Sequence, residues 1–403
     1  MNTKLLFYNL MVLCFIFPIA PKLIPFLLVI ISIISLFNFK IEKYKELKYY
    51  LPFTFSILFY VFCIAGLIWS TDIYSGIKHL EIKLSFLVIP IILLNKNLIS
   101  ENKIIHLLQA FTIGNFIAAI YALTIAAFTY LRDGVNHFTY TLLSPNFHPT
   151  YLSIYALFAL VLLLNINHLI TKSRTLKMIV IIVLVIWILL LSSKINIALL
   201  FVLLVIQLTI TLKSSKNKLM LLSWSAVLSV LIAAFLFLNT SITERFKASF
   251  NAIKHANIIV NKETESNTAR ILVWKSAIDL VISNPVIGVG TGDVNNELVK
   301  EYEKRSYIGI KEKRLNAHNQ FLQTALATGI PSALLLFIFL IIPLLLYQNS
   351  KYRILHYFII VFCINGLVES TFENQAGVVF FIFFYFLLLR CISNKIELNN
   401  IFR

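Results

Sequence analysis

Charged residues and cysteines are both scarce in this sequence. Asp, Glu, Lys and Arg together make up 13% of its 403 residues, about half the share that is usual in soluble domains. Cys14, Cys63 and Cys363 lie inside apolar runs, and Cys391 ends the last such run. Cysteines placed in this way exclude a disulfide framework and a cysteine-based metal site.

Apolar residues, in contrast, are abundant enough to exclude a soluble globular protein. Hydrophobic residues account for 59% of the chain, and the mean hydropathy is +0.86. The formal net charge of +17 raises the question of a nucleic-acid partner, but in so apolar a chain the excess of lysine is better explained by membrane topology. We therefore predict an all-α, polytopic membrane protein that lies in a lipid bilayer and binds no nucleic acid.

About twelve membrane-spanning helices are predicted from the apolar runs, which charged residues, proline and glycine delimit. The fourth run is short and needs the amphipathic stretch from Thr71 to Ile82 in front of it. The chain then divides into spans one to nine (1–238), a large loop domain (239–330), and spans ten to twelve with a tail (331–403). The predicted spans are 5–20, 23–38, 51–69, 83–94, 104–130, 149–166, 177–192, 195–212, 219–238, 331–348, 354–369 and 373–390.

Lysine and arginine are distributed unevenly between alternate loops. With the N-terminus in the cytoplasm, the cytoplasmic segments hold 18 of these residues and the short opposite loops hold 5. Basic residues near the ends of spans stay on the cytoplasmic side of the membrane. Both termini are therefore predicted to be cytoplasmic, and the long loop is predicted to be extracytoplasmic.

The long loop, 239–330, greatly exceeds the usual connection of about 4 to 6 residues and is predicted to form a small helical domain. Asn284-Pro285 is expected to stop one of its helices, and Gly329 followed by Pro331 to separate the last of them from span ten. The expected helices are Thr243 to Asn257, Asn267 or Thr268 to Ser283, Asp293 to Arg305, and Ala317 to Thr328.

Arg270 is the first candidate for a functional residue in this loop. It lies in the first turn of a predicted helix and shares a face with Val273, Trp274 and Ala277. A guanidinium binds phosphate oxygens in a fork, and a helix N-terminus adds backbone N–H donors. The pattern is compatible with an anion site, but on the local sequence alone an ion pair of Arg270 with Glu263 or Glu265 explains it better.

His318 is the second candidate, because it stands with Asn316 and Asn319 in a polar cluster that opens the next helix. A neutral imidazole accepts a proton from a hydroxyl near pH 7, and a neighbouring Asn can orient it. A capping or packed histidine is the alternative. No second histidine or carboxylate stands at metal-ligand spacing, so we expect neither a metal nor a cofactor.

Other polar groups belong to the turns around these candidates. The glycine-rich turn from Gly288 to Asp293 could present N–H groups to an anion, but a tight turn between helices explains it better. Lys194 lies in a short hairpin between spans seven and eight, where a lipid diphosphate would sit. Trp69 to Asp72, with Lys78 and Lys83, are further candidates in the extracytoplasmic loops. Glu369 and Glu373 flank the last hairpin and are expected to pair with basic groups. The residues expected to bind substrate are Lys194, Arg132, Arg314, Asn319, His148 and Tyr151.

Four of these segments, in their order along the chain, resemble the O-antigen ligase and O-antigen polymerase superfamily. They are Arg270-Ile-Leu-Val-Trp274-Lys-Ser-Ala, Asn284-Pro285-Val-Ile-Gly288-Val-Gly290, Ala317-His318-Asn319-Gln320-Phe321-Leu322-Gln323, and Gly329-Ile330-Pro331. The segments Trp69-Ser70-x-Asp72 and His148-Pro149-Thr150-Tyr151 are similar to it more loosely. One departure is that many members carry Ser-Arg-Gly where this chain has Ser193-Lys194-Ile195, which keeps the charge and loses the fork.

The resemblance implies a metal-independent transferase of the bacterial inner membrane with a periplasmic active site. The donor would be a glycan on undecaprenyl diphosphate and the acceptor a hydroxyl group. The family's loop arginine and histidine correspond to Arg270 and His318. Arg270 and Lys194, helped by Arg132 or Arg314, would then clamp the diphosphate, and His318 would deprotonate the acceptor for attack with inversion.

The acceptor stays open at this point. A ligase uses lipid A-core, a polymerase uses another lipid-linked repeat, and a protein O-oligosaccharyltransferase uses Ser or Thr of a polypeptide. Of these, the ligase is expected. A transporter or flippase of polyprenyl-linked sugars is the alternative of a different class, but repeat-related halves are not visible and such a protein needs no large external domain.

Overall fold

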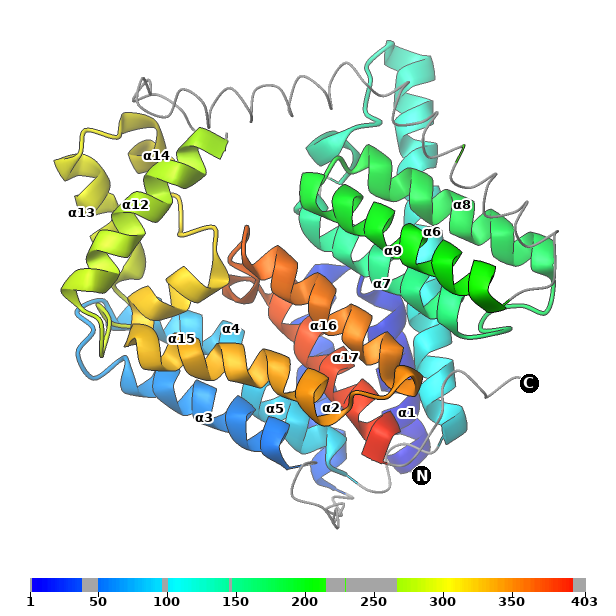
Figure 1. The fold of residues 1–403 in the computed structure, drawn as a ribbon, viewed down its shortest axis with the longest axis horizontal. Helices are drawn as coiled ribbons and strands as arrows, with labels where there is room; N and C mark the ends of the chain where they lie inside the picture. The colour runs from blue at the N-terminus through cyan, green and yellow to red at the C-terminus, as the bar shows by residue number, and fades with distance from the viewer. Residues whose placement is uncertain are drawn as a thin grey trace.

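The computed structural model describes residues 2–37, 50–95, 101–144, 147–214, 229 and 267–393, and all the regular secondary structure in these ranges is helical (Figure 1). The predicted span 219–238, apart from Ser229, and the predicted helix 243–257 lie outside these residues. The helices are α1 Asn2–Ile16, α2 Ile24–Leu36, α3 Leu51–Ala65, α4 Ile73–Lys83, α5 Ser85–Leu93, α6 Glu101–Asp133, α7 Pro149–Asn165, α8 Arg174–Leu190, α9 Lys194–Ser214, α12 Asn267–Ser283, α13 Val294–Lys304, α14 Ile308–Glu312, α15 Gln320–Leu346, α16 Arg353–Gly366 and α17 Gln375–Ser393, with the 3-10 turn η5 Thr371–Glu373 before α17.

Helix α17 lies at the centre of the larger of two apolar cores. It packs against α5, α6 and α16, and α16 and α17 lie between α7 to α9 on one side and α3 to α5 on the other (Figure 1). Its side chains are buried almost without exception, and its phenylalanines interlock with those of other helices: Phe381 stacks on Phe358 at 5.4 Å and Phe380 tilts against Tyr155 at 4.2 Å. A helix that is apolar on every face is stable only inside a bundle of this kind.

Several helices have the length and composition of membrane spans. Among the described residues, Lys103–Asp133, Gln320–Leu346 and Gln375–Ile392 are long and apolar enough to cross a bilayer, and five shorter helices are apolar. Phe26, Phe37, Phe128 and Leu131 expose more than half of their surface. Exposed apolar faces of this extent suit lipid better than water. The fold is therefore all-α and membrane-embedded, and the number of twelve spans remains a prediction.

The predicted fourth span, 83–94, corresponds to α5, and the amphipathic stretch predicted in front of it corresponds to α4. Helix α4 ends at Lys83, and α5 begins at Ser85 and has 9 residues, fewer than the roughly 20 that a perpendicular span needs. Lys83, at the junction of α4 and α5, buries its ammonium against a carboxylate of a distant loop. A charged contact therefore lies at the start of the predicted span.

A second, smaller core is built by α12, α13, α14 and the first part of α15, at one end of the molecule (Figure 1). The helices predicted from Asn267 and Asp293 match α12 and α13 closely, and α12 ends at Ser283 as the Asn-Pro signal indicated. Helix α15 begins at Gln320 instead of Ala317, and its backbone breaks at Thr328 and Gly329, where φ of the glycine is +87°. The predicted separation of loop helix and span is thus confirmed as a break within α15.

Candidate active site

The carboxylate of Glu369 is the centre of the candidate site. Glu369 lies between α16 and η5, and its side chain is 13% exposed. The imidazole Nδ1 of His318 approaches Glu369 Oε1 at 3.3 Å, and the guanidinium Nη2 of Arg270 lies 3.9 Å from Oε2. The two residues that sequence reasoning ranked first, 48 positions apart, therefore share one carboxylate.

His318 is held in a left-handed backbone conformation, with φ of +42°. Both backbone groups of the preceding Ala317 are bound: its N–H donates to Gln323 Oε1 at 3.0 Å, and its carbonyl accepts from Trp274 Nε1 at 3.0 Å. The N–H of His318 donates to Asn316 Oδ1 at 3.0 Å. Surroundings that fix the backbone on both sides can maintain a conformation that non-glycine residues rarely adopt. The outcome is a histidine in a defined position and not a freely rotating surface group.

Asn319 joins the start of α15 to the loop that carries Glu369. Its Oδ1 accepts from the N–H groups of Phe321 and Leu322 at 2.9 and 3.0 Å, so that Asn319 is the N-cap. Its Nδ2 donates to the Leu367 carbonyl at 3.1 Å. Asn319, predicted as a binding residue, is thus placed by the structure as a link between His318 and Glu369.

Arg270 lies in the first turn of α12, whose inner face buries Val273 and Ala277. Its side chain is 34% exposed, and its Nε is buried without a hydrogen-bond partner among the described residues. At 3.9 Å the contact with Glu369 is an ion pair without a close hydrogen bond. Guanidinium donors therefore remain for an anion. The suggested alternative partners, Glu263 and Glu265, lie outside the described residues.

Glu369 is ionised at neutral pH. Burial raises its pKa, but the hydrogen bond and charge of His318, with the charges of His148 and Arg270, outweigh burial and bring the pKa below its ordinary value. A carboxylate bonded to Nδ1 of a histidine selects the tautomer whose other nitrogen, Nε2, accepts a proton. The same carboxylate stabilises the imidazolium that forms when the proton arrives.

Of the remaining candidates, His148 and Tyr151 lie at the start of α7, close enough for His148 to influence Glu369. The two rings face each other edge-on at 6.3 Å, with His148 exposed and Tyr151 buried. Lys194 is the half-buried first residue of α9. Asn196, two residues further on, donates to the Thr150 carbonyl at 3.3 Å and so ties this hairpin to α7. His148 is thus placed near Glu369, and Lys194 lies at the start of a helix that is tied to α7.

Arg132 and Arg314 are placed differently. Arg132 is exposed at the end of α6 and makes a double contact with Asp133, at 2.8 and 2.6 Å. Arg314 is exposed and donates to Asn296 Oδ1 of α13 at 2.8 Å. In the part of the chain that the structure describes, neither guanidinium is brought to Glu369.

The glycine-rich turn from Gly288 to Asp293 packs α12 and α13 onto the rest of the molecule. Its backbone N–H groups donate to protein acceptors: Val289 to Leu326, Gly290 to Ala327 and Thr291 to Gly66, at 2.7 to 3.1 Å. The Asp293 carboxylate accepts from the N–H groups of Thr71 and Asp72 at 2.6 and 2.8 Å. These bonds confirm a tight turn. The N–H groups at the three positions are already used within the protein, so they are not free to bind an anion.

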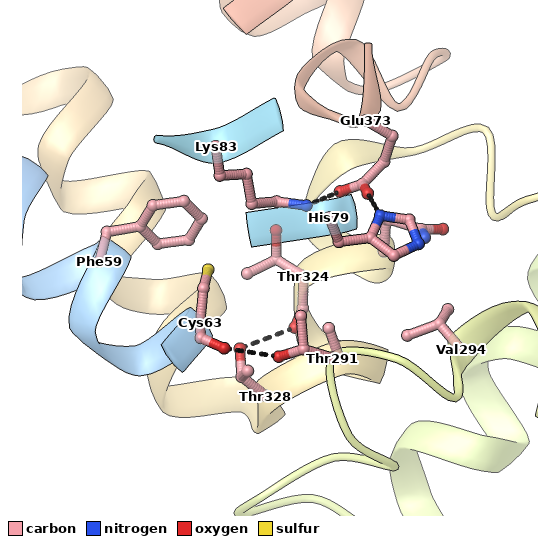
Figure 2. A pocket seen from close by; sticks show the side chains of 11 residues that line it. Phe59, Cys63, His79, Lys83, Thr291, Val294, Thr324, Thr328 and Glu373 are labelled. Carbon is pink, nitrogen blue, oxygen red and sulfur yellow. Dashed lines mark hydrogen bonds and ion pairs between the residues drawn. The ribbon is translucent and has the colours of Figure 1, made fainter. Parts of the chain in front are cut away.

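A second buried cluster surrounds Glu373, four residues after Glu369 (Figure 2). Lys83 Nζ lies 2.7 Å from Glu373 Oε1, and His79 Nδ1 lies 2.9 Å from Oε2. Sequence reasoning expected a basic partner for this glutamate, and the partner is Lys83; it missed His79, one turn before Lys83 on α4. Burial raises the pKa of Glu373, but the charge of Lys83 and the hydrogen bond and charge of His79 lower it to about 2.

The buried ion pairs of Glu373 should make the stability of the folded protein depend on pH. The carboxyl pKa is about 2 in the folded chain and ordinarily 4.5, so the stabilisation is complete above about pH 4.5 and is lost as the pH falls toward 2. This difference corresponds to roughly 3 kcal/mol. We expect the melting temperature of the purified protein to fall through this window, and to fall less steeply in Glu373→Gln. An equal fall of the melting temperature with pH in the two proteins would contradict this.

Metal-binding groups are not assembled around either glutamate. Within the described ranges there is no cluster of three or more His, Cys, Asp and Glu side chains that could hold a metal ion. The chemical groups that the candidate site does offer are an imidazole next to a carboxylate, a guanidinium at the same carboxylate, and the imidazole of His148 nearby.

Comparison with protein families finds a match for part of the chain. Residues 157–338 match the family described as O-Antigen ligase, and the matched segment contains Lys194, Arg270 and His318. A comparison with curated proteins finds no match. The resemblance predicted from the sequence is thus confirmed, and the chain carries an O-antigen ligase domain. It is an integral membrane protein of bacterial type with a glycan-transferring role in O-antigen processing.

Proposed function

We propose that the protein transfers a glycan from undecaprenyl diphosphate to a hydroxyl group of lipid A-core at the periplasmic face of the inner membrane. The transfer is metal-independent and inverts the anomeric carbon. The observation that carries this proposal is the single carboxylate of Glu369, which His318 and Arg270 approach at 3.3 and 3.9 Å. One bound donor and one acceptor hydroxyl could reach both groups at once.

His318 acts as the general base. The acceptor O–H gives its proton to Nε2 as the acceptor oxygen attacks the anomeric carbon, and the bond from that carbon to the diphosphate oxygen breaks. Undecaprenyl diphosphate leaves with the electron pair of this bond. Glu369, bonded to Nδ1, compensates the positive charge that the imidazole gains, and a general base of this kind contributes about 10²–10⁴-fold in rate.

Arg270 stabilises the negative charge that grows on the leaving diphosphate. A fixed donor aimed at developing charge accelerates a reaction because it need not reorganise during the step. Lys194, at the start of α9, adds a point charge without the fork that arginine would provide. Arg132 and Arg314 are not used in this scheme, since both are held at other places.

The proposal is tested by transfer assays in proteoliposomes with the lipid-linked glycan on the outer face. We expect wild-type protein to convert lipid A-core and release undecaprenyl diphosphate, with an inverted glycosidic linkage. Elongation of the lipid-linked glycan itself would indicate a polymerase instead, and transfer to Ser or Thr of a peptide a protein O-oligosaccharyltransferase. Movement of the donor without any transfer would overturn the enzymatic proposal.

Glu369→Gln tests the role of the carboxylate in the same assay. The amide keeps the shape and loses the charge, so the imidazolium is less stable, and we expect kcat to fall at least about tenfold. The acid limb of the pH–rate profile should move to lower pH, because protonation of the base becomes harder. Glu303→Gln, at an exposed glutamate of α13, is the matched control and should retain wild-type values. An unchanged kcat and profile in Glu369→Gln would remove Glu369 from the mechanism.

A further inference from the structure

The loop between α16 and α17 carries two carboxylates that are bound in parallel ways. Glu369 contacts a histidine and an arginine, His318 and Arg270. Glu373 contacts a histidine and a lysine, His79 and Lys83. The first set forms the candidate active site, and the scheme proposed above leaves the second set without a function.

The second set has no room for a substrate. The cavity beside it, lined by Phe59, Thr291 and Thr324, has a volume of about 10 Å³, which is the space for about one water molecule. The Lys83 side chain is 6% exposed and that of Glu373 is 10% exposed. A lysine and a glutamate that are buried this deeply are stable only as a pair. Their effect must therefore act through the elements that they join.

Lys83 and His79 belong to α4, and Glu373 belongs to the loop that presents Glu369 (Figure 2). The same loop has further contacts with the start of α15: the N–H of Phe372 donates to Gln320 Oε1 at 2.6 Å, besides the bond from Asn319 to Leu367. The segment is thus fixed at its beginning, next to His318, and at its end, next to Lys83. Glu369 lies between the two fixed points.

We propose that Lys83 is a positioning residue, which through Glu373 holds the loop so that Glu369 meets His318. This inference rests on the proposed function. Lys83 touches neither the base nor the guanidinium, and its part is to set the place of the carboxylate. A displacement of about 1 Å in a catalytic group can cost about 10²-fold in rate.

Lys83→Met removes the ammonium and keeps most of the apolar stem. In the proteoliposome assay we expect kcat to fall about 10- to 100-fold, with KM for the lipid-linked donor within about twofold of wild type. The acid limb of the pH–rate profile should move to lower pH, as in Glu369→Gln, because Glu369 no longer supports the imidazolium. The charged groups that face Glu369 are His318, Arg270 and His148, and Lys83→Met leaves all three in place.

A second variant distinguishes the positioning role of Lys83 from a role in stability alone. Lys83→Met combined with Glu373→Gln removes both buried charges, so that no unpaired ion remains, and we expect its melting temperature at neutral pH to exceed that of Lys83→Met. The contact between Lys83 and Glu373 is still absent, so kcat should stay low and the acid limb of the pH–rate profile should stay at lower pH. Lys78→Met is the matched control, because Lys78 is an exposed lysine of the same helix, and it should behave as wild type.

Two outcomes would overturn the inference. The first is a double variant that recovers wild-type kcat and pH profile together with its stability. The second is Lys83→Met with wild-type kinetics. His318→Ala in the same preparations keeps this separate from the proposed function: if His318→Ala is inactive while Lys83→Met is normal, only the positioning role fails. If His318→Ala transfers glycan at the wild-type rate, the proposed function fails as well.

Discussion

Replacing His318 with alanine should lower kcat for glycan transfer by about 10²–10⁴-fold, the usual contribution of a general base. The structure supports a loss of this size because Glu369 orients the ring through Nδ1 at 3.3 Å and leaves Nε2 for the acceptor hydroxyl. KM for the donor should change little, since the imidazole acts on the acceptor. Initial rates with purified protein at saturating donor measure this.

The control for this variant should be a histidine whose backbone has the same unusual conformation, so that alanine destabilises both proteins alike. His168→Ala provides it, because His168 is exposed and also has a positive φ, +52°, compared with +42° at His318. Alanine in a left-handed conformation should destabilise both proteins to a similar degree. We expect only His318→Ala to lose activity. A His318→Ala protein that is folded and as active as His168→Ala would rule out the proposed base.

Replacing Arg270 with methionine should lower kcat/KM by about 10²–10³-fold, the loss that follows removal of a donor to developing negative charge. Arg270→Lys should lie between this variant and wild type, because it keeps the charge and loses the fork. The order wild type, lysine, methionine is expected in titrations of donor binding and in initial rates. It follows from the partial exposure of Arg270 and its unsatisfied Nε.

Arg174→Met is the control, since Arg174 is an exposed arginine in the first turn of another helix, α8. It should transfer glycan at the wild-type rate. If Arg270→Met did the same, the ion pair with Glu369 would be the only role left for this guanidinium. If lysine and methionine at position 270 gave equal losses, the fork would matter and the charge would not.

Features with a local physical cause were predictable from the sequence. Asn284-Pro285 ends α12 because proline cannot continue a helix without losing a hydrogen bond, and Gly329 breaks α15 because its φ of +87° suits glycine. Asn319 was visible as part of a polar helix start, although its second bond, to Leu367, was not. Arg270 and His318 were found from their surroundings within a few residues and from the family resemblance.

The sequence indicated that Glu369 pairs with basic groups, but it could not indicate which ones. Glu369 follows His318 by 51 residues and Arg270 by 99, and only the packing of α12, α15 and α16 brings the three together. Nothing in the sequence around Glu369 distinguishes it from Glu373, whose partners lie on α4. The contact of Lys83 with Glu373 spans 290 residues.

The break in α15 is closely packed against the turn that follows α12. At Gly329 a Cβ would collide with the Val286 carbonyl oxygen, and Ile330 donates its N–H to the Pro285 carbonyl at 2.8 Å. The turn that follows α12 is thereby joined to the break in α15, far along the chain from Arg270 and His318 themselves. Any side chain larger than hydrogen at position 329 would push these two segments apart, so the distance between guanidinium and imidazole should depend on a glycine that touches neither of them.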